Sequence, residues 1–168
     1  MIGSNTRDYV QDSGESLYRR SLYTFWKRSA PPASLDIFNA PNREHCVVVR
    51  ERTNTPLQAL VTLNDPQYVE AACQLAQRAM KEGGAEFEPR LSFIATRLLA
   101  REFTSEERAI VQSSLEKLAE HYSAHEAEAK ALIDVGETQP DAALPPGELA
   151  AWTMVVNELM NLDEFLNK

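Results

Sequence analysis

Signals that begin α-helices recur along the chain after Thr53, and they constrain the fold more than any other feature of the sequence. Thr55-Pro56-Leu57-Gln58 sets a threonine at the N-cap, a proline at the first helical position and a glutamine three residues after the cap, which is a capping box. Asn64-Asp65-Pro66-Gln67 repeats this arrangement, and Thr104-Ser105-Glu106-Glu107 is another capping box. The sequence therefore predicts helices that begin near residues 56, 66 and 105.

Apolar residues spaced three and four apart indicate the buried face of each predicted helix. The pattern predicts helices over residues 66–82, 89–101, from 105, over 124–133 and from 146, with Gly83-Gly84 ending the first of these. A proline-bearing loop is expected over 136–146, and 162–166 adds a turn. The residues expected to face the core are Val69, Ala72, Cys73, Ala76, Ala79, Met80, Leu91, Ile94, Ala95, Leu98, Leu99, Ile110, Val111, Leu115, Leu118, Tyr122, Leu149, Trp152, Thr153, Val156, Leu159 and Met160. The predicted fold class is mainly α, as an orthogonal or bundle-like helical array.

The first third of the chain has a different character, with prolines and aromatic residues and little helical periodicity. We expect a short helix over 16–28, ended by Ala30-Pro31-Pro32, and irregular chain over 35–41. The apolar run Cys46–Val49 predicts one short strand or an extended buried segment. The expected organisation is an irregular N-terminal segment, residues 1–52, that is part of a domain beginning upstream, followed by a helical domain over residues 53–168.

Charge and composition narrow the classes of function. The net charge is −8, with 8 Lys and Arg against 6 Asp and Glu in residues 1–60, which leaves 9 against 19 in residues 61–168. An acidic chain is a poor candidate for nucleic acid, whose phosphates must be neutralised by cations. We find no apolar run long enough to span a membrane and no signal peptide within this chain.

Familiar catalytic motifs are absent from the sequence: it has no Gly-rich phosphate loop, nucleophile elbow or His-Glu-x-x-His helix. His121 and His125 share a helix face, but a zinc site needs three or four converging ligands, so a solvated pair is favoured and no metal is expected. Cys46 and Cys73 could pair or remain buried thiols, and buried thiols are favoured.

Two clusters are candidate binding sites. Residues 18–28 interleave four aromatic residues with four cations, a combination that binds sugars, nucleotides or single strands, although burial of the rings in a core or an interdomain seam is favoured. Residues 50–55 precede a helix N-terminus, which attracts anions, although an ion-paired cap region is favoured. The candidate binding residues are Arg20, Tyr23, Trp26, Arg50, Arg52 and Asn54, and no catalytic residue is assigned.

Several ordered runs resemble one known family. They are residues 17–28, Ala30-Pro31-Pro32, residues 38–44, 50–60 and 63–67, and the closing runs 148–152 and 161–166. Together they resemble the planctomycete-specific domain of unknown function found at the C-terminus of large planctomycete proteins. The resemblance implies that this chain is the C-terminal part of that domain.

The resemblance implies export and an extracytoplasmic location, in the periplasm or at the cell surface. Members often carry an upstream cytochrome-c-like module with a Cys-x-x-Cys-His motif. That motif is absent from this sequence, so no cofactor is expected in this chain. The family has no established activity.

These observations favour a noncatalytic helical interaction or scaffolding domain of a larger exported protein. Its expected partners are upstream domains of the same protein, other proteins or a polysaccharide. The alternative is a carbohydrate-handling or other enzyme domain whose site combines the aromatic and arginine cluster with upstream residues.

Overall fold

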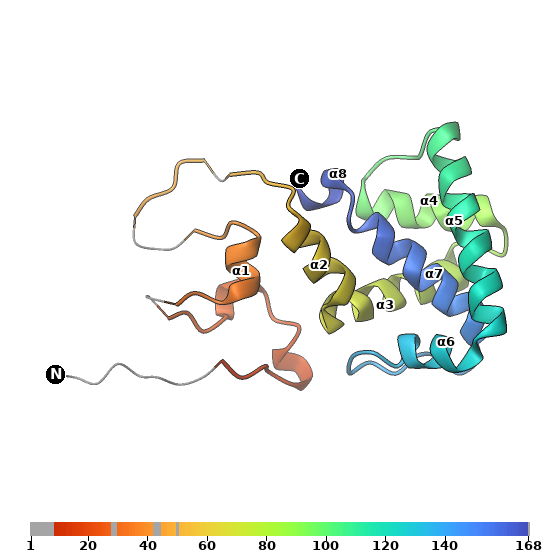
Figure 1. Cartoon of the computed structure of the whole chain (residues 1–168), viewed down its shortest axis with the longest axis horizontal. Coiled ribbons are helices and arrows are strands. Elements are labelled where there is room, and N and C mark those ends of the chain that lie inside the picture. The colour runs from red at the N-terminus through yellow and green to blue at the C-terminus, as the bar shows by residue number, and fades with distance from the viewer. Residues whose placement is uncertain (1–8, 28–29, 42–44, 50, 168) are drawn as a thin grey trace. The chain divides into compact units, whose positions relative to one another are not determined.

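The computed structural model describes residues 9–27, 30–41, 45–49 and 51–167 (Figure 1). These ranges contain eight α-helices and no strand, with one isolated bridge between Lys27 and Ala30, so the predicted mainly α class is confirmed. The chain divides into two compact units, Met1–Thr53 and Asn54–Lys168. That the first segment belongs to a domain that begins upstream stays a prediction.

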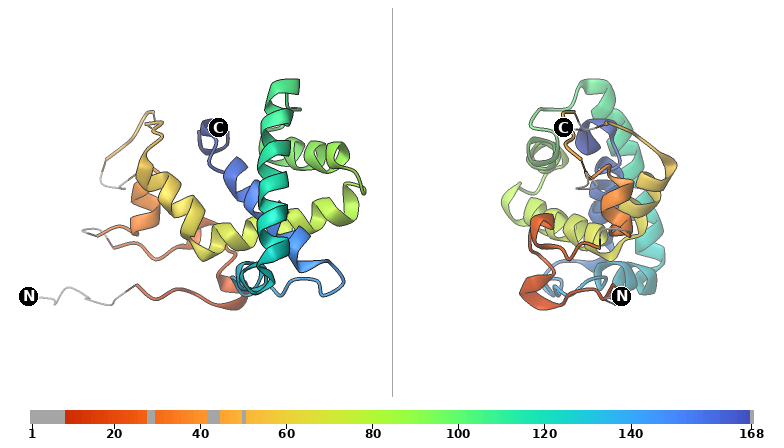
Figure 2. Two further views of the ribbon diagram at one scale, coloured as in Figure 1. Left: turned by 45° about the vertical axis from the view of Figure 1, so that its right-hand side comes forward. Right: turned by 90° about the vertical axis from the view of Figure 1, so that its left-hand side faces the viewer.

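The second unit is built around its penultimate helix. Its helices are α2 (Pro56–Asn64), α3 (Pro66–Glu82), α4 (Phe87–Leu98), α5 (Ser105–Ala124), α6 (Glu126–Ile133), α7 (Pro146–Leu159) and α8 (Asp163–Leu166). Helix α7 packs against α3, α5 and α6, and α3 also packs against α4 and α2. Figure 2 shows α5 as the long helix of this unit, with α6 turning across its end. The array is therefore organised by one central helix and its neighbours.

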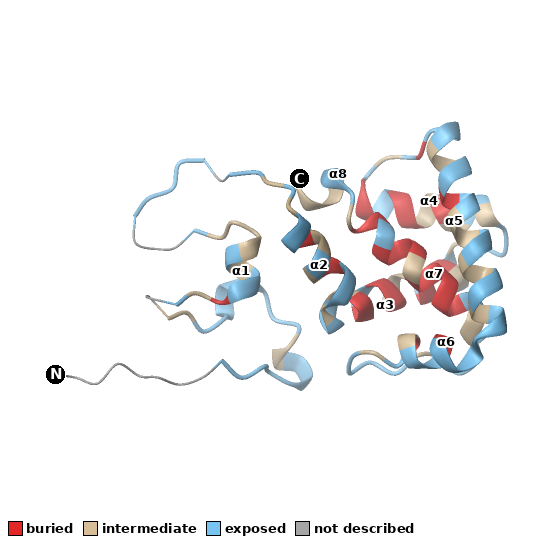
Figure 3. Ribbon diagram, in the orientation of Figure 1, coloured by how far each residue is buried: buried red, intermediate tan, exposed pale blue. Residues whose placement is uncertain are grey.

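Helix α7 is buried around most of its circumference because it has neighbours on several sides. Nine of its residues are buried: Leu149, Ala150, Ala151, Trp152, Thr153, Val155, Val156, Asn157 and Leu159. A helix that is apolar on nearly every face belongs in the interior of a domain. Figure 3 shows the buried residues concentrated on α7, α3 and α4. The core is contiguous across these helices, and the predicted inward faces of α3 and α7 are confirmed.

The predicted helix starts are confirmed at atomic detail. The Thr55 hydroxyl accepts a hydrogen bond from the Gln58 N–H at 3.3 Å, and Gln58 Oε1 accepts one from the Thr55 N–H at 2.8 Å. Thr104 and Glu107 form the same reciprocal pair at the start of α5. Helix α3 spans the predicted residues and begins at a cap in which the Asp65 side chain accepts from the Gln67 N–H.

Helix α4 lies slightly upstream of its predicted bounds of 89–101. It begins at Phe87, so Pro89 lies in the first turn, where a proline is tolerated because its missing N–H would have no intrahelical partner. It ends at Leu98, and Ala100 has a φ of 56°, a left-handed conformation that stops the helix.

Ile110 is the one residue of the predicted apolar stripe of α5 that the structure contradicts. The buried stripe is made by Val111, with Leu115, Leu118 and Tyr122 partly buried against the core, at positions spaced three and four apart. Ile110 lies about 100° around the helix from Val111 and is 71% exposed. Helical geometry cannot bury both neighbours on this narrow stripe.

The first unit has a shorter α-helix than predicted, and this helix lies at different residues. The expected helix over 16–28 is wrong: up to residue 27, where the described segment ends, the chain forms 3-10 turns at Gly14–Ser16 and Ser21–Tyr23 and no α-helix. Serine, threonine and aromatic residues are weak helix formers, and Arg20 provides no side-chain cap. The expected irregular chain over 35–41 is also wrong in part, because α1 (Ala33–Ile37) follows Pro32.

The strand predicted at Cys46–Val49 is not formed, and the segment is not buried. Val48 is 94% exposed and Val49 is 79% exposed. A strand needs a partner for its backbone hydrogen bonds, and the described residues provide none here. Cys46 and Cys73 are both free thiols, and only Cys73 is buried as expected.

Two buried side chains of α3 hold the loop between α6 and α7. Glu70 is 3% exposed and accepts a hydrogen bond from the Thr138 N–H at 2.8 Å, while Gln77 accepts one from the Asp141 N–H at 2.8 Å. Lys81 adds an ion pair to Asp141 at 2.5 Å. Gly136 has a φ of 106°, and a Cβ there would meet the Glu70 carboxylate at 2.5 Å. The loop path thus requires glycine for both conformation and space.

We expect Thr55→Ala to lower the free energy of unfolding by about 1 kcal/mol, because it leaves the Gln58 N–H without its cap acceptor. Thr55→Ser keeps the hydroxyl and is expected to lose much less. Urea unfolding of both variants measures the difference. Equal losses would mean that the threonine methyl group, and not the hydroxyl, stabilises the helix start.

We expect Gly136→Ala to be more damaging than Gly84→Ala. Both glycines have positive φ, so each alanine costs about 1 to 2 kcal/mol of backbone strain, but a Cβ at Gly84 meets Pro89 at an ordinary 3.6 Å. The crowding against Glu70 should add about 1 to 3 kcal/mol at Gly136. Thermal unfolding compares the two variants, and equal losses would show that the loop moves away from Glu70 without cost.

Candidate functional site

The residues proposed from the sequence as a binding site lie in both units. Arg20 and Tyr23 are exposed, with Arg20 immediately before the 3-10 turn Ser21–Tyr23, and Trp26 is half-buried. Arg52 is exposed in the first unit, and Asn54 is exposed at the start of the second. Arg50 lies outside the described residues. That these residues bind a ligand stays a prediction.

Tyr9, which was not among the predicted binding residues, organises the aromatic segment, residues 18–27. Its ring lies 6.1 Å from the Phe25 ring, centroid to centroid, and the Lys27 ammonium lies 4.6 Å from the Tyr9 centroid. The Tyr9 hydroxyl donates to the Ala30 carbonyl at 2.6 Å and accepts from the Lys27 N–H at 3.2 Å. Tyr9 stands nine residues before the cluster and carries no local motif, so only the fold reveals its contacts.

Large side chains of this segment point to solvent. Tyr18 is 56%, Leu22 69%, Tyr23 70% and Phe25 57% exposed. These side chains therefore do not fill a core within the described residues of this unit, and their burial in an interdomain seam stays a prediction. Exposed Arg19 and Arg20 lie between Tyr18 and Leu22 in the chain. The unit thus presents aromatic and cationic groups together, the pairing that supports stacking and cation–π contacts.

The start of α2 is a weak candidate for an anion site. Its capping box already supplies acceptors to the Thr55 and Gln58 N–H groups, and Pro56 has no N–H to offer. An anion at a helix N-terminus needs such donors. The cap thus accounts for the threonine, and ligand binding by Arg52 or Asn54 stays a prediction.

A buried polar seam joins α2 to α7. Gln58 and Thr62 are 2% and 0% exposed, and Asn157 donates its amide to the Thr62 carbonyl at 2.9 Å. The Thr62 hydroxyl can donate to the Gln58 carbonyl at 3.0 Å or to Asn161 Oδ1. Polar pairing of this kind fixes the orientation of one helix on another because misaligned partners would leave buried groups unsatisfied.

Cys73 is a free cysteine buried in the core, and its surroundings make its thiol unreactive. Burial raises the pKa of its thiol above the ordinary value, an effect that contacts with Thr153 and Gln77 oppose. A thiol with a raised pKa holds little of the reactive thiolate at neutral pH. The chemistry therefore points to a packing role for Cys73.

The two histidines at the α5–α6 junction make internal contacts. His121 Nε2 lies 3.0 Å from Glu128 Oε2, and His125 Nδ1 lies 2.8 Å from the His121 carbonyl oxygen. Their rings stack with centroids 4.5 Å apart. Within the described ranges, His, Cys, Asp and Glu form no group of three or more that could hold a metal ion. The pair thus contacts the end of α5 and the start of α6.

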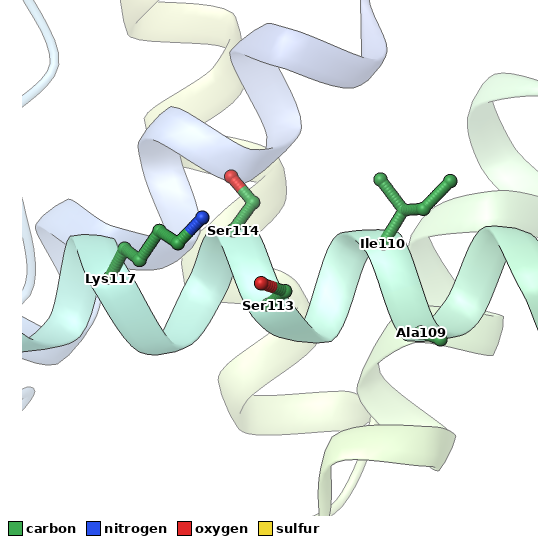
Figure 4. Close-up of a pocket in the computed structure, with 5 residues that line it drawn as sticks. All are labelled: Ala109, Ile110, Ser113, Ser114 and Lys117. Carbon is green, nitrogen blue, oxygen red and sulfur yellow. The ribbon is translucent and has the colours of Figure 1, made fainter.

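A shallow hollow of about 430 Å³ lies along one side of α5. Figure 4 shows the five residues that line it, and all come from this helix: Ala109, Ile110, Ser113, Ser114 and Lys117. Ser114 donates to Glu158 of α7 at 2.8 Å, so its hydroxyl is already engaged. Lys117 is the one ionisable side chain in the lining, which leaves the hollow without an acid–base pair.

Arg101 links three segments of the second unit. Its guanidinium binds Glu107 through two hydrogen bonds of 3.0 and 2.9 Å and Glu164 of α8 through contacts of 2.8 to 3.0 Å. The hydrogen bonds from Arg101, with that from the Thr104 N–H, lower the pKa of Glu107 to about 2. The network ties α8 to the turn between α4 and α5.

Among the described residues, no helix is both long enough and apolar enough to cross a membrane.

Comparison with known proteins identifies a family but no activity. Residues 2–115 match the family model described as PSD1, protein of unknown function (DUF1553). The match spans the aromatic segment, α2, α3, α4 and the first half of α5, while the closing runs 148–152 and 161–166 lie outside it. No curated protein and no solved structure matches the chain.

The Arg101 network predicts a loss of stability in acid. The pKa of Glu107 is lowered in the folded protein. The stability that the ionised Glu107 contributes is therefore fully present above its ordinary pKa of 4.5 and is lost as the pH falls through about 2. Glu107→Gln should therefore flatten the fall in melting temperature between pH 5 and pH 2. Glu106→Gln, at the exposed preceding position, is the control. An equal flattening by both variants would contradict the assignment to Glu107.

Proposed function

This chain belongs to the DUF1553 family of proteins of unknown function, and we propose that it is a noncatalytic helical interaction domain of a larger exported protein. Its partners are upstream domains of the same protein, other proteins or a polysaccharide. The proposed location is extracytoplasmic, in the periplasm or at the cell surface. Support for that location comes from the resemblance to the exported planctomycete family.

The exposed aromatic segment of the first unit is the observation that carries the proposal. Within eight residues, four large side chains are each more than half exposed: Tyr18, Leu22, Tyr23 and Phe25. Contiguous exposed apolar groups on a soluble protein mark interaction sites. Aromatic residues and arginines are also the types enriched in protein interfaces. The segment has the composition of a binding surface.

The ionisable groups of the second unit support a structural role. Arg101, Glu107 and Glu164 bind one another across helix ends, and Arg90 binds Glu148. The Glu70 carboxylate accepts a hydrogen bond from the backbone of the α6–α7 loop. Side chains that make such contacts hold the helices in place. Their engagement in these contacts favours a scaffolding role for the second unit over a catalytic one.

A carbohydrate-handling domain is the second candidate, because the Tyr23 ring is 70% exposed in the aromatic segment that also carries exposed Arg20. Sugars are bound by stacking on such rings with polar groups beside them. In an enzyme of this kind, upstream residues would supply the catalytic groups. The two candidates share the surface and differ in what occupies it.

Photocrosslinking in the full-length protein tests the proposal. A benzoylphenylalanine in place of Tyr23 is expected to crosslink to an upstream domain or to another protein. The same label in place of Ile110 is the matched control, because Ile110 is 71% exposed on a separate helix. Crosslinking at neither position, together with retention of the chain on immobilised polysaccharide that Tyr23→Ala abolishes, would favour the carbohydrate candidate. Equal crosslinking at both positions would contradict a specific surface at Tyr23.

A further inference from the structure

The aromatic segment belongs to a loop whose two ends are joined by Tyr9. The Tyr9 hydroxyl donates to the Ala30 carbonyl at 2.6 Å and accepts from the Lys27 N–H at 3.2 Å. Between these contacts the chain makes 3-10 turns at Gly14–Ser16 and Ser21–Tyr23. Loops whose ends lie close together often carry binding residues.

The second of these turns brings a cation and an aromatic ring together. The Tyr23 N–H donates to the Arg20 carbonyl at 2.9 Å, and a bond of this kind holds the two Cα atoms within about 7 Å of each other. Both side chains are exposed, as are those of Arg19 and Leu22 beside them in the chain. A single ligand can therefore contact guanidinium and apolar groups at once.

Arg19 and Arg20 differ from the arginines of the second unit, each of which has a carboxylate partner. Among the described residues, neither Arg19 nor Arg20 forms an ion pair. In the second unit, a carboxylate oxygen lies within 3.9 Å of each arginine, namely Arg78, Arg90, Arg97, Arg101 and Arg108. Arg19 and Arg20 thus remain available to a carboxylate from another molecule.

The aromatic segment is a local concentration of positive charge on an acidic chain. Residues 18–27 contain three cations and no Asp or Glu, whereas the net charge of the whole chain is −8. Complementary charge determines where partners dock and speeds their association. A guanidinium can also bind a carboxylate through two parallel hydrogen bonds. An acidic partner is therefore attracted to this segment and repelled by most of the remaining surface.

The side chains of the segment suit a polypeptide better than a sugar. Sugar hydroxyls need hydrogen-bond acceptors as well as donors, and Arg and Lys side chains only donate. Residues 18–27 contain no Asp, Glu, Asn or Gln, so hydroxyl groups are the only oxygen acceptors among their side chains. Leu22 and Phe25 are 69% and 57% exposed and offer surface to apolar side chains. Aromatic residues and arginines together are typical of protein interfaces.

We propose that the aromatic segment binds an acidic protein segment that also carries apolar side chains. Carboxylates of the partner pair with Arg19 and Arg20. Its apolar side chains pack on Leu22, Tyr23 and Phe25. This inference rests on the proposed function and deepens it, because it names the chemistry of the partner at the same surface.

The two kinds of contact respond differently to salt. Exposed ion pairs contribute little each and are screened by added salt. Apolar packing on the rings does not depend on such screening. The contribution of the arginines can therefore be separated from that of the rings by experiment.

Binding of the full chain to fluorescent poly(Glu,Tyr), a random copolymer of glutamate and tyrosine, tests the proposal. The chain is expected to bind this polymer more tightly than polyglutamate, which has no rings, and to bind both more weakly as NaCl is raised from about 50 to about 500 mM. Changing both Arg19→Gln and Arg20→Gln should weaken binding of both polymers about tenfold. Tyr23→Ala should weaken binding of poly(Glu,Tyr) and leave that of polyglutamate unchanged.

Two further variants serve as controls. Lys117→Gln removes an exposed cation from the second unit and should leave the binding unchanged. The pair Arg19→Lys and Arg20→Lys keeps the charge and should retain more binding than the glutamine pair. Circular dichroism shows whether each variant is folded.

The proposal is overturned if poly(Glu,Tyr) does not bind, if the glutamine pair has no effect, or if Lys117→Gln weakens binding equally. Polygalacturonate, a carboxylated polysaccharide, is the remaining arm of the experiment. If it binds as tightly as poly(Glu,Tyr), and the glutamine pair weakens this binding too, the ligand is a polysaccharide and the protein partner is overturned.

The crosslinking experiment at Tyr23 distinguishes failure of this inference from failure of the proposed function. A crosslink to a protein segment without acidic residues would uphold the interaction domain and overturn the acidic partner. Binding of poly(Glu,Tyr) that depends on Arg19 and Arg20, with no crosslink in the full-length protein, would support the chemistry of the surface and count against the proposed function.

Discussion

The burial of α7 on several sides at once is the constraint on which the second unit depends. Helices α3, α5 and α6 all pack against it, and its small residues Ala150 and Ala151 are fully buried. Small side chains let neighbouring backbones approach closely, while Trp152 fills the larger space beside Phe87, with ring centroids 6.0 Å apart. Removing α7 would separate helices that have few contacts with one another.

Contacts at the ends of helices complement this apolar centre. Arg101 joins α8 to the α4–α5 turn, Glu70 and Gln77 hold the α6–α7 loop, and His125 contacts the last turn of α5. Each of these polar side chains acts where a helix begins, ends or meets a loop. The apolar residues decide which helices pack together, and the polar residues decide how the connections run.

The parts of the fold that depend on residues close to one another in the sequence could be predicted from it. Thr55, Gln58, Thr104 and Glu107 form capping boxes through contacts three residues apart, and the stripe of α3 follows from helical spacing alone. The exposure of the leucines of α2 could not be predicted, because Thr62 is oriented by Asn157, 95 residues later. The exposure of the Val48 region and the contacts of Tyr9 likewise depend on tertiary packing, so residue types alone could not place the candidate site.

The capping box at Thr55 lies entirely within the second unit. The chain divides after Thr53, and the N–H groups of Thr55 and Gln58 are satisfied by each other's side chains, which both belong to the second unit. These two donors therefore need no hydrogen-bond acceptor from the preceding segment. A substitution before Thr53 therefore leaves both hydrogen bonds of the cap in place, so the start of α2 tolerates sequence changes in the segment that precedes it.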